Sequence, residues 1–163
     1  MNSQAVIPPF LSEGDTIGLV ATARFIEREA LNYAINEIGK YGLNVKVADN
    51  AEDKLYQLAG DDDRRVEAFN ELLRDPEVKA LLVVRGGYGT VRIVDRIDWD
   101  YLKKHPKWIC GFSDVTVLHN YVNRHLNMAS VHCAMPVTYK SNSAAALQTL
   151  FGSLKGETRE LVL

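Results

Sequence analysis

One serine of this sequence lies where nucleophilic chemistry is favoured. Ser113 belongs to Gly111-Phe112-Ser113-Asp114, at the end of the apolar run 108–112. A serine between a buried strand and a helix sits in a tight turn that exposes its hydroxyl group, as in many hydrolases. The backbone N–H of Asp114 would point from the helix start into the same space and could stabilise an oxyanion. The second glycine of GxSxG is absent, so a helix cap by Ser113 or Asp114 is the alternative.

A second candidate turn is Arg85-Gly86-Gly87-Tyr88-Gly89, which follows the apolar run 81–84. Its backbone N–H groups are suited to an anion, or to a second oxyanion donor beside Ser113. The turn has neither GxGxxG spacing nor a Gly-Lys-Ser/Thr ending, so nucleotide binding rests on glycine content alone. A tight turn that needs positive φ is an equal interpretation.

A nucleophilic serine also needs a base, and the sequence offers few histidines for that role. His119 and His125 follow Ser113 on one predicted helix, at spacings that turn their side chains away from it. His132 ends a predicted strand and is the one internal candidate, although a packing or loop role is favoured for it.

The elements that must position these turns alternate along the chain. Strands are predicted at 17–21, 43–48, 81–84, 108–112 and 128–132, of which 17–21 and 81–84 are short apolar runs typical of buried strands. Helical patterns at 26–41, 61–73, 91–97, 114–126 and 144–151 predict helices. This alternation predicts a doubly wound parallel sheet with helices on both faces. Ligands bind at the carboxyl edge of such sheets, where both turns would converge if their strands are neighbours.

Composition narrows the class of protein further. The 163 residues are 47% hydrophobic and 25% charged, and 19 basic against 21 acidic residues give a net charge of −2. These values predict one globular domain and no nucleic-acid partner. Cys110 and Cys133 lie outside any CxxC spacing, which disfavours a zinc cluster or a disulfide framework. No signal peptide or membrane span is evident, so we expect a cytoplasmic protein without a membrane partner.

The order and spacing of several motifs resemble those of one enzyme family. The motifs are Gly14-Asp15-Thr16-Ile17-Gly18, Asp75-Pro76-Glu77-Val78-Lys79-Ala80, the glycine turn, and Pro106-Lys107-Trp108 leading to Gly111-Phe112-Ser113-Asp114. Together they resemble the N-terminal domain of LD-carboxypeptidases, serine peptidases that include muramoyltetrapeptide carboxypeptidase and the microcin-immunity peptidases. The implied fold is Rossmann-like, or class I glutamine amidotransferase-like.

The resemblance implies a role for each motif. Ser113 would be the nucleophile, and backbone N–H groups of Asp114 and Gly87 would form the oxyanion hole. Gly86 and Tyr88 would contact the substrate, although Tyr88 as a plain surface aromatic is an equal reading. Arg85 either binds the terminal carboxylate of the substrate or forms a structural ion pair. The implied reaction removes terminal D-alanine from murein tetrapeptide in cell-wall recycling, without a metal or organic cofactor.

The chain also departs from the family. Thr22 stands where members usually have proline, and His132-Cys133-Ala134-Met135 replaces His-Gly-Pro-Met. Members carry a second domain that supplies the glutamate and histidine of a Ser-Glu-His triad. We therefore expect residues 1–163 to form only the nucleophile-bearing domain, nearly inactive alone, with 156–163 beginning an interdomain segment. In the full-length protein we expect that C-terminal domain as partner, and a homodimer.

Two other functions remain open from the sequence. One is a non-catalytic module that binds a small anion or nucleotide at residues 86–89, unaffected by Ser113→Ala. The other is an interaction domain that exposes an apolar face and self-associates.

Overall fold

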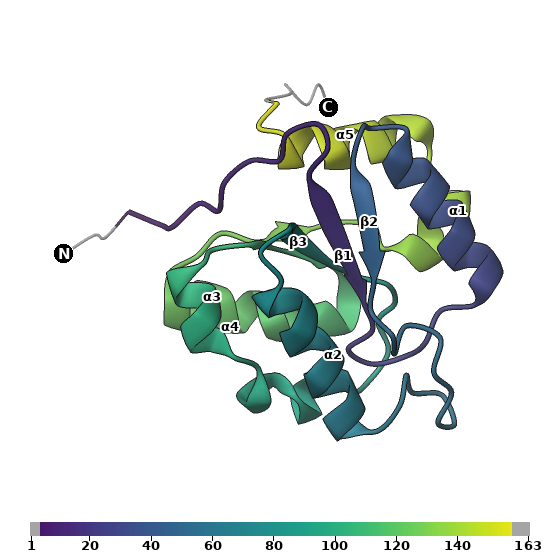
Figure 1. Cartoon of the computed structure of the whole chain (residues 1–163), viewed down its shortest axis with the longest axis vertical. Helices are drawn as coiled ribbons and strands as arrows, with labels where there is room; N and C mark the ends of the chain where they lie inside the picture. Colours follow the sequence, from purple (N-terminus) through teal and green to yellow (C-terminus); the bar gives the residue numbers. More distant parts are fainter. Residues whose placement is uncertain (1–3, 158–163) are drawn as a thin grey trace.

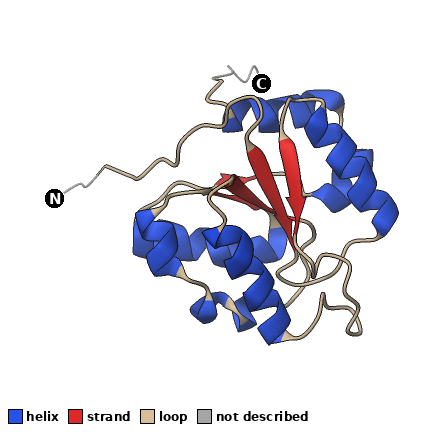
Figure 2. Cartoon of the chain, in the orientation of Figure 1, coloured by secondary structure: helices blue, strands red, loops and turns tan. Residues whose placement is uncertain are grey.

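The computed structural model describes residues 4–157, and these fold around one parallel sheet. Its strands lie in the order β2-β1-β3-β4-β5. Their bounds are β1 Thr16–Val20, β2 Asn44–Val47, β3 Val78–Val83, β4 Trp108–Gly111 and β5 Val131–His132. The predicted doubly wound α/β fold is therefore confirmed (Figures 1 and 2).

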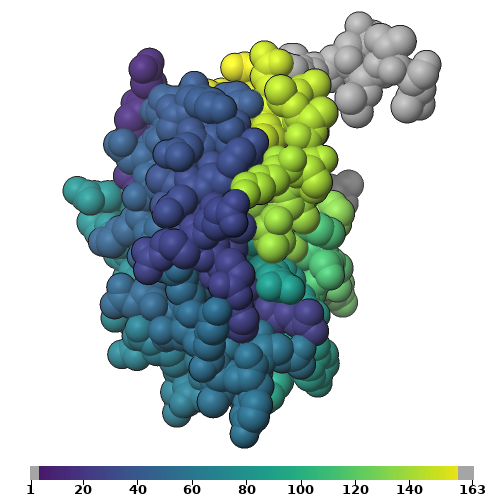
Figure 3. Space-filling model, turned by 90° about the vertical axis from the view of Figure 1, so that its right-hand side faces the viewer, coloured from purple at the N-terminus to yellow at the C-terminus, as the bar shows by residue number. Residues whose placement is uncertain are grey.

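Helices cover both faces of this sheet. Helices α1 (Arg28–Gly39) and α5 (Ala144–Leu154) lie on one face. Helices α2 (Asp62–Arg74), α3 (Trp99–Lys104) and α4 (Thr116–Leu126) lie on the other. Figure 3 shows α1 and α5 side by side on the outer surface of the first layer. The chain must cross from one layer to the other, which gives the sheet a switch point.

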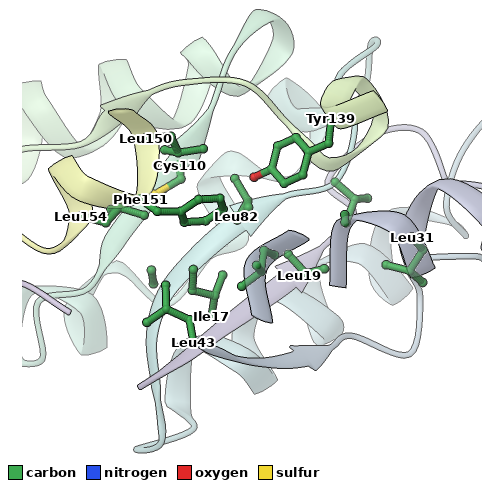
Figure 4. Close-up of a cluster of buried hydrophobic side chains, with 14 of the residues drawn as sticks. Ile17, Leu19, Leu31, Leu43, Leu82, Cys110, Tyr139, Leu150, Phe151 and Leu154 are labelled. Carbon is green, nitrogen blue, oxygen red and sulfur yellow. The ribbon is translucent and has the colours of Figure 1, made fainter. Parts of the chain in front are cut away.

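Each helix layer encloses its own apolar core. On the α1 and α5 side, Ile17 and Leu19 of β1 pack with Leu82, Phe151 and Tyr139 (Figure 4). On the other side, alternate residues of the same strands pack against α2, α3 and α4. Strands buried on both faces read as continuous apolar runs, which is why their positions were predictable.

The switch point lies between β1 and β3. Strand β1 pairs with β2 on one side and with β3 on the other, and β3 pairs with β4. The loops after β1 and β3 leave the sheet at its carboxyl edge, with the turn after β4 beside them. The expectation that the glycine turn and the serine turn follow neighbouring strands is confirmed.

The segment after the glycine turn differs from the prediction. Residues 91–97 read as one helix, but they form two short 3₁₀ turns, Thr90–Arg92 and Val94–Arg96. The helix of this connection is α3, which begins at Trp99 with the Asp98 side chain accepting from the Tyr101 N–H. Another 3₁₀ turn, Pro136–Ser141, follows β5. Helix α1 begins two residues later than predicted, at Arg28, and β5 is reduced to Val131–His132.

No helix among the described residues is long and apolar enough to cross a membrane. Within the same range, no group of three or more His, Cys, Asp or Glu side chains is arranged to hold a metal ion. The interdomain segment predicted for 156–163 falls mostly at 158–163, outside the described residues.

Candidate active site

The serine turn has the backbone of a strained, exposed nucleophile. Ser113 has a φ of 62°, in the left-handed region that side chains other than glycine rarely adopt. It begins a 3₁₀ turn, Ser113–Val115, between the end of β4 and the start of α4, and it is exposed. Such strain at a strand-to-helix turn holds a hydroxyl group outward, and it persists only where surrounding structure fixes it.

Gly86 allows the glycine turn to approach this serine closely. A β-carbon at position 86 would lie 3.2 Å from Cβ and 3.3 Å from Oγ of Ser113. It would also lie 3.4 Å from Cε of Met135. The absence of a side chain at Gly86 therefore leaves room beside the Ser113 hydroxyl.

The next residue, Gly87, presents its backbone in a conformation that favours glycine. Its φ is 135°, and a β-carbon there would lie 2.8 Å from Cγ of Arg24. Tyr88 follows with 66% of its surface exposed. Arg24, from the loop after β1, thus lies directly against the glycine turn, a contact that no local sequence pattern indicated.

The Asp114 side chain ties the two turns together. Its Oδ2 accepts the backbone N–H of Thr90 at 2.9 Å. No side-chain cap is found at the start of the 3₁₀ turn or of α4, so the cap interpretation of Ser113 and Asp114 is wrong. The hydroxyl groups of Thr90 and Thr22 lie 2.8 Å apart and join the glycine turn to the loop after β1.

A buried arginine fixes the far end of the glycine turn. The Arg65 side chain on α2 is fully buried, and its Nη1 donates to the carbonyls of Thr22 (2.7 Å) and Gly89 (3.1 Å). Its Nη2 donates to the Asp62 carboxylate. Burial lowers the pKa of Arg65, but a guanidinium group remains charged at neutral pH. This charge is structural and faces away from solvent.

Among residues 4–157, no histidine is hydrogen-bonded to Ser113. Nε2 of His119 lies 2.9 Å from the Gly111 carbonyl and Nδ1 lies 2.9 Å from Oγ of Ser130. Burial lowers the pKa of His119, so its neutral form is favoured. His132 ends β5 as predicted, exposed, with its ring 6.3 Å from the Phe112 ring. Within residues 4–157 no hydrogen bond joins it to Ser113.

A cavity opens on the β5 side of the serine turn. It has a volume of about 520 Å³ and is lined by Phe112, His132, Cys133, Ala134, Thr138, Ser141 and Asn142. Neighbouring Cys110 is not a rival nucleophile, because a hydrogen bond with Cys133 and full burial raise the pKa of its thiol.

Comparison with known proteins decides the family. Residues 17–133 match the LD-carboxypeptidase N-terminal domain. The chain belongs to the LD-carboxypeptidase family. A probable murein peptide carboxypeptidase from Bacillus subtilis is 38% identical over 128 residues, which cover 78% of this chain and 40% of that protein. A murein tetrapeptide carboxypeptidase from Pseudomonas aeruginosa is 27% identical over 117 residues, 71% of this chain and 38% of that protein.

Solved structures agree with this LD-carboxypeptidase fold. A muramoyltetrapeptide carboxypeptidase from Oxalobacter formigenes superposes with a TM-score of 0.76 and 26% identity over 85% of this chain and 47% of that one. An MccF-like protein from Bacillus anthracis gives a TM-score of 0.85 at 24% identity over 92% of this chain and 47% of that one. The chain spans less than half the length of these relatives.

Sequence reasoning missed several residues of this candidate site. Arg24, Thr22 and Arg65 approach the glycine turn from other elements, and none belongs to a motif with a recognised chemistry. Thr22 was noted only as a departure from the family. One signal could have found Arg65: it stands four residues before Phe69, on the apolar face of the predicted helix, where a charged residue is unusual.

Proposed function

We propose that this chain is the nucleophile-bearing domain of a serine carboxypeptidase that hydrolyses L,D-peptide bonds. The proposal rests on Ser113, which is exposed, has a φ of 62° and lies against Gly86 at the carboxyl edge of the sheet. The proposed substrate is murein tetrapeptide, and the product released is its terminal D-alanine. The names of the curated relatives support this substrate.

In the proposed reaction, Oγ of Ser113 attacks the carbonyl carbon before the terminal D-alanine, while a base takes the hydroxyl proton. The resulting oxyanion accepts hydrogen bonds from the backbone N–H groups of Asp114 and Gly87. The carbon–nitrogen bond then breaks, the amine takes the proton, and D-alanine leaves. Water hydrolyses the acyl ester on Ser113 and restores the hydroxyl group.

We assign substrate contact to Gly86 and Tyr88. Gly86 leaves the space beside Oγ open, and the exposed Tyr88 follows two residues later at the same turn. The cavity beside Phe112 offers room for the peptide on the acyl side of the bond. In this proposal the peptide lies across the carboxyl edge of β3, β4 and β5.

We infer that the base comes from a second domain. His119 is held by Gly111 and Ser130, and His132 is not bonded to Ser113 within the described residues. The greater length of the relatives supports this inference. Residues 1–163 alone would then hydrolyse peptide slowly, because the Ser113 hydroxyl stays neutral while the oxyanion donors remain. We place the complete protein in the cytoplasm. We also propose that it is a homodimer, and sedimentation of the purified gene product would test this oligomeric state.

The gene product isolated from its own cell tests the proposal. Its intact mass is compared with 18.2 kDa, and D-alanine release from murein tetrapeptide is assayed with Ser113→Ala and, as a matched control, Ser153→Ala on α5. We expect a heavier product whose activity is lost only in Ser113→Ala. A product of 18.2 kDa with full activity would contradict the inference that a second domain supplies the base. A product that releases no D-alanine would contradict the proposed carboxypeptidase activity.

A nucleotide-phosphate loop at residues 86–89 is less well supported. The Thr90 N–H beside this turn already donates to the Asp114 carboxylate and is therefore not available to a phosphate group. We therefore propose an oxyanion donor rather than a nucleotide-phosphate loop.

A further inference from the structure

Two arginines at the glycine turn have no acidic partner. Among the described residues, no carboxylate lies within ion-pair distance of Arg24 or Arg85. Apart from Arg124, every other arginine of this range pairs with an acidic side chain; these are Arg28, Arg64, Arg65, Arg74, Arg92 and Arg96. The structural ion pair considered for Arg85 is thus absent from residues 4–157.

Both guanidinium groups form few hydrogen bonds, and the acceptors are neutral carbonyl groups. Arg24 Nη2 donates to the side-chain carbonyl of Gln57, and its Nε is buried without a partner. Arg85 Nη1 makes one long bond, 3.5 Å, to the carbonyl of Phe25. Carboxylates bind guanidinium groups more strongly than neutral carbonyls do, so both side chains retain capacity for an anion.

Three acidic residues of the loops after β1 and β2 are already paired with other cations. Glu27 pairs with Lys54, and Glu52 pairs with Arg28 at 2.7 Å. Asp53 pairs with Arg64 at 3.0 Å. These carboxylates therefore do not form ion pairs with Arg24 or Arg85 in the part of the chain that the structure describes.

The position of this charge relative to Ser113 gives it a specific use. Gly86 faces Ser113, and the next residue, Gly87, faces Arg24, whose Nε would lie 3.1 Å from a β-carbon there. Arg85 directly precedes Gly86. In a peptide that ends in D-alanine, only the amide nitrogen and the α-carbon separate the scissile carbonyl from the terminal carboxylate. The guanidinium groups thus lie on the β1 side of Ser113, and the 520 Å³ cavity lies on the β5 side.

We propose that Arg24 and Arg85 form a subsite for the terminal carboxylate of the substrate, and so restrict this site to the last residue of a peptide. The inference rests on the proposed carboxypeptidase function and orients the substrate within it. The leaving D-alanine lies toward β1, and the rest of the peptide lies toward β5. Arg24 and Arg85 are specificity-determining residues and take no part in proton transfer.

The subsite is tested by the binding of two matched peptides to the purified gene product, which carries Ser113→Ala to prevent turnover. One is murein tetrapeptide with a free terminal carboxylate, and the other is the same peptide with a terminal amide. Calorimetric titration compares the parent with Arg24→Gln, Arg85→Gln and the unpaired control Arg124→Gln. We expect about tenfold or greater preference for the acid in the parent and in Arg124→Gln. We expect that preference to fall toward unity in the two site variants.

Arg24→Lys is a second test, because lysine keeps the positive charge but lacks the planar guanidinium fork. We expect Arg24→Lys to show part of the preference for the acid that Arg24→Gln loses. Equal binding of acid and amide by the parent would overturn the subsite and leave the proposed peptide site standing. Binding of neither peptide by a folded parent would overturn the proposed function and this inference together.

Discussion

The carboxylate of Asp114 accepts the backbone N–H of Thr90 at 2.9 Å, so the residue that follows Ser113 also fixes the glycine turn opposite it. Asp114 therefore contributes in two separate ways. Its own N–H is a proposed oxyanion donor, and its side chain positions the segment that carries the other donor, Gly87. Substitutions of the side chain separate these contributions because they leave the backbone N–H in place.

Asp114→Ala should lower D-alanine release by the gene product on the order of 10²-fold, because misplacement of a turn by about 1 Å has effects of that size. The buried Thr90 N–H loses its acceptor, which should lower the free energy of unfolding by roughly 1–3 kcal/mol. Asp114→Asn keeps an acceptor oxygen and should retain most of the activity and most of the stability. Equal losses in the two variants, measured by steady-state kinetics and urea unfolding, would contradict the positioning role.

Gly86→Ala should reduce activity far more than stability. The added β-carbon would come within 3.2–3.3 Å of Cβ and Oγ of Ser113, so the Ser113 side chain must shift. Gly39→Ala is the matched control, because nothing lies within 4 Å of its β-carbon at the end of α1. The control should gain roughly 0.5–1 kcal/mol in stability with unchanged kcat. Full activity of Gly86→Ala would show that the turn and Ser113 do not depend on this close approach.

Arg65→Met should destabilise the chain by roughly 3–5 kcal/mol, as measured by urea unfolding. The substitution leaves the carbonyls of Thr22 and Gly89 and the Asp62 carboxylate without their buried donor. Arg96→Gln removes an exposed ion pair with Asp63 and should change stability by less than about 1 kcal/mol. Similar losses of stability in the two variants would mean that the buried Arg65 network stabilises the fold no more than a surface ion pair does.

Lys107 should make the stability depend on pH in the alkaline range. Its side chain is buried and donates to the Asp75 carbonyl at the end of α2, and burial lowers its pKa to about 8. The unfolded chain keeps this proton until about pH 10.5, so between pH 8 and 10.5 it binds more protons than the folded chain. The wild type should therefore gain stability relative to Lys107→Met as pH rises through this window, by at most about 1.4 kcal/mol per pH unit.

The comparison of the two proteins across pH removes the contribution of other groups. Lys40 and Lys46 have raised pKa values through Glu37 and Asp75, and both remain in Lys107→Met. Parallel stability curves from pH 7.5 to 10.5 would contradict a depressed pKa at Lys107.

The sequence was sufficient for the features that depend on local patterns. Buried strands read as apolar runs, and their alternation with helices predicted the parallel sheet. The serine and glycine turns could be recognised because each is a contiguous motif at a strand end. Neighbouring strands then bring Ser113 and Gly86 together.

Long-range contacts explain what was missed. Residues 91–97 have helical spacing, yet the Thr90 N–H is taken by Asp114 and the segment breaks into 3₁₀ turns. Arg24 and Arg85 form their arrangement through the loop after β1 and the turn after β3, which are distant in sequence. Whether an arginine lacks a carboxylate partner is a property of the whole charge arrangement, and no spacing rule reports it.

The most direct test of the central claim is detection of an acyl ester on Ser113. The gene product is mixed with murein tetrapeptide, quenched in acid within a turnover, digested and analysed by mass spectrometry. The account predicts that the peptide containing Ser113 gains the mass of the tetrapeptide without its D-alanine, and that Ser113→Ala shows neither the adduct nor D-alanine release. Release of D-alanine by Ser113→Ala at the wild-type rate would contradict the claim that Ser113 is the nucleophile.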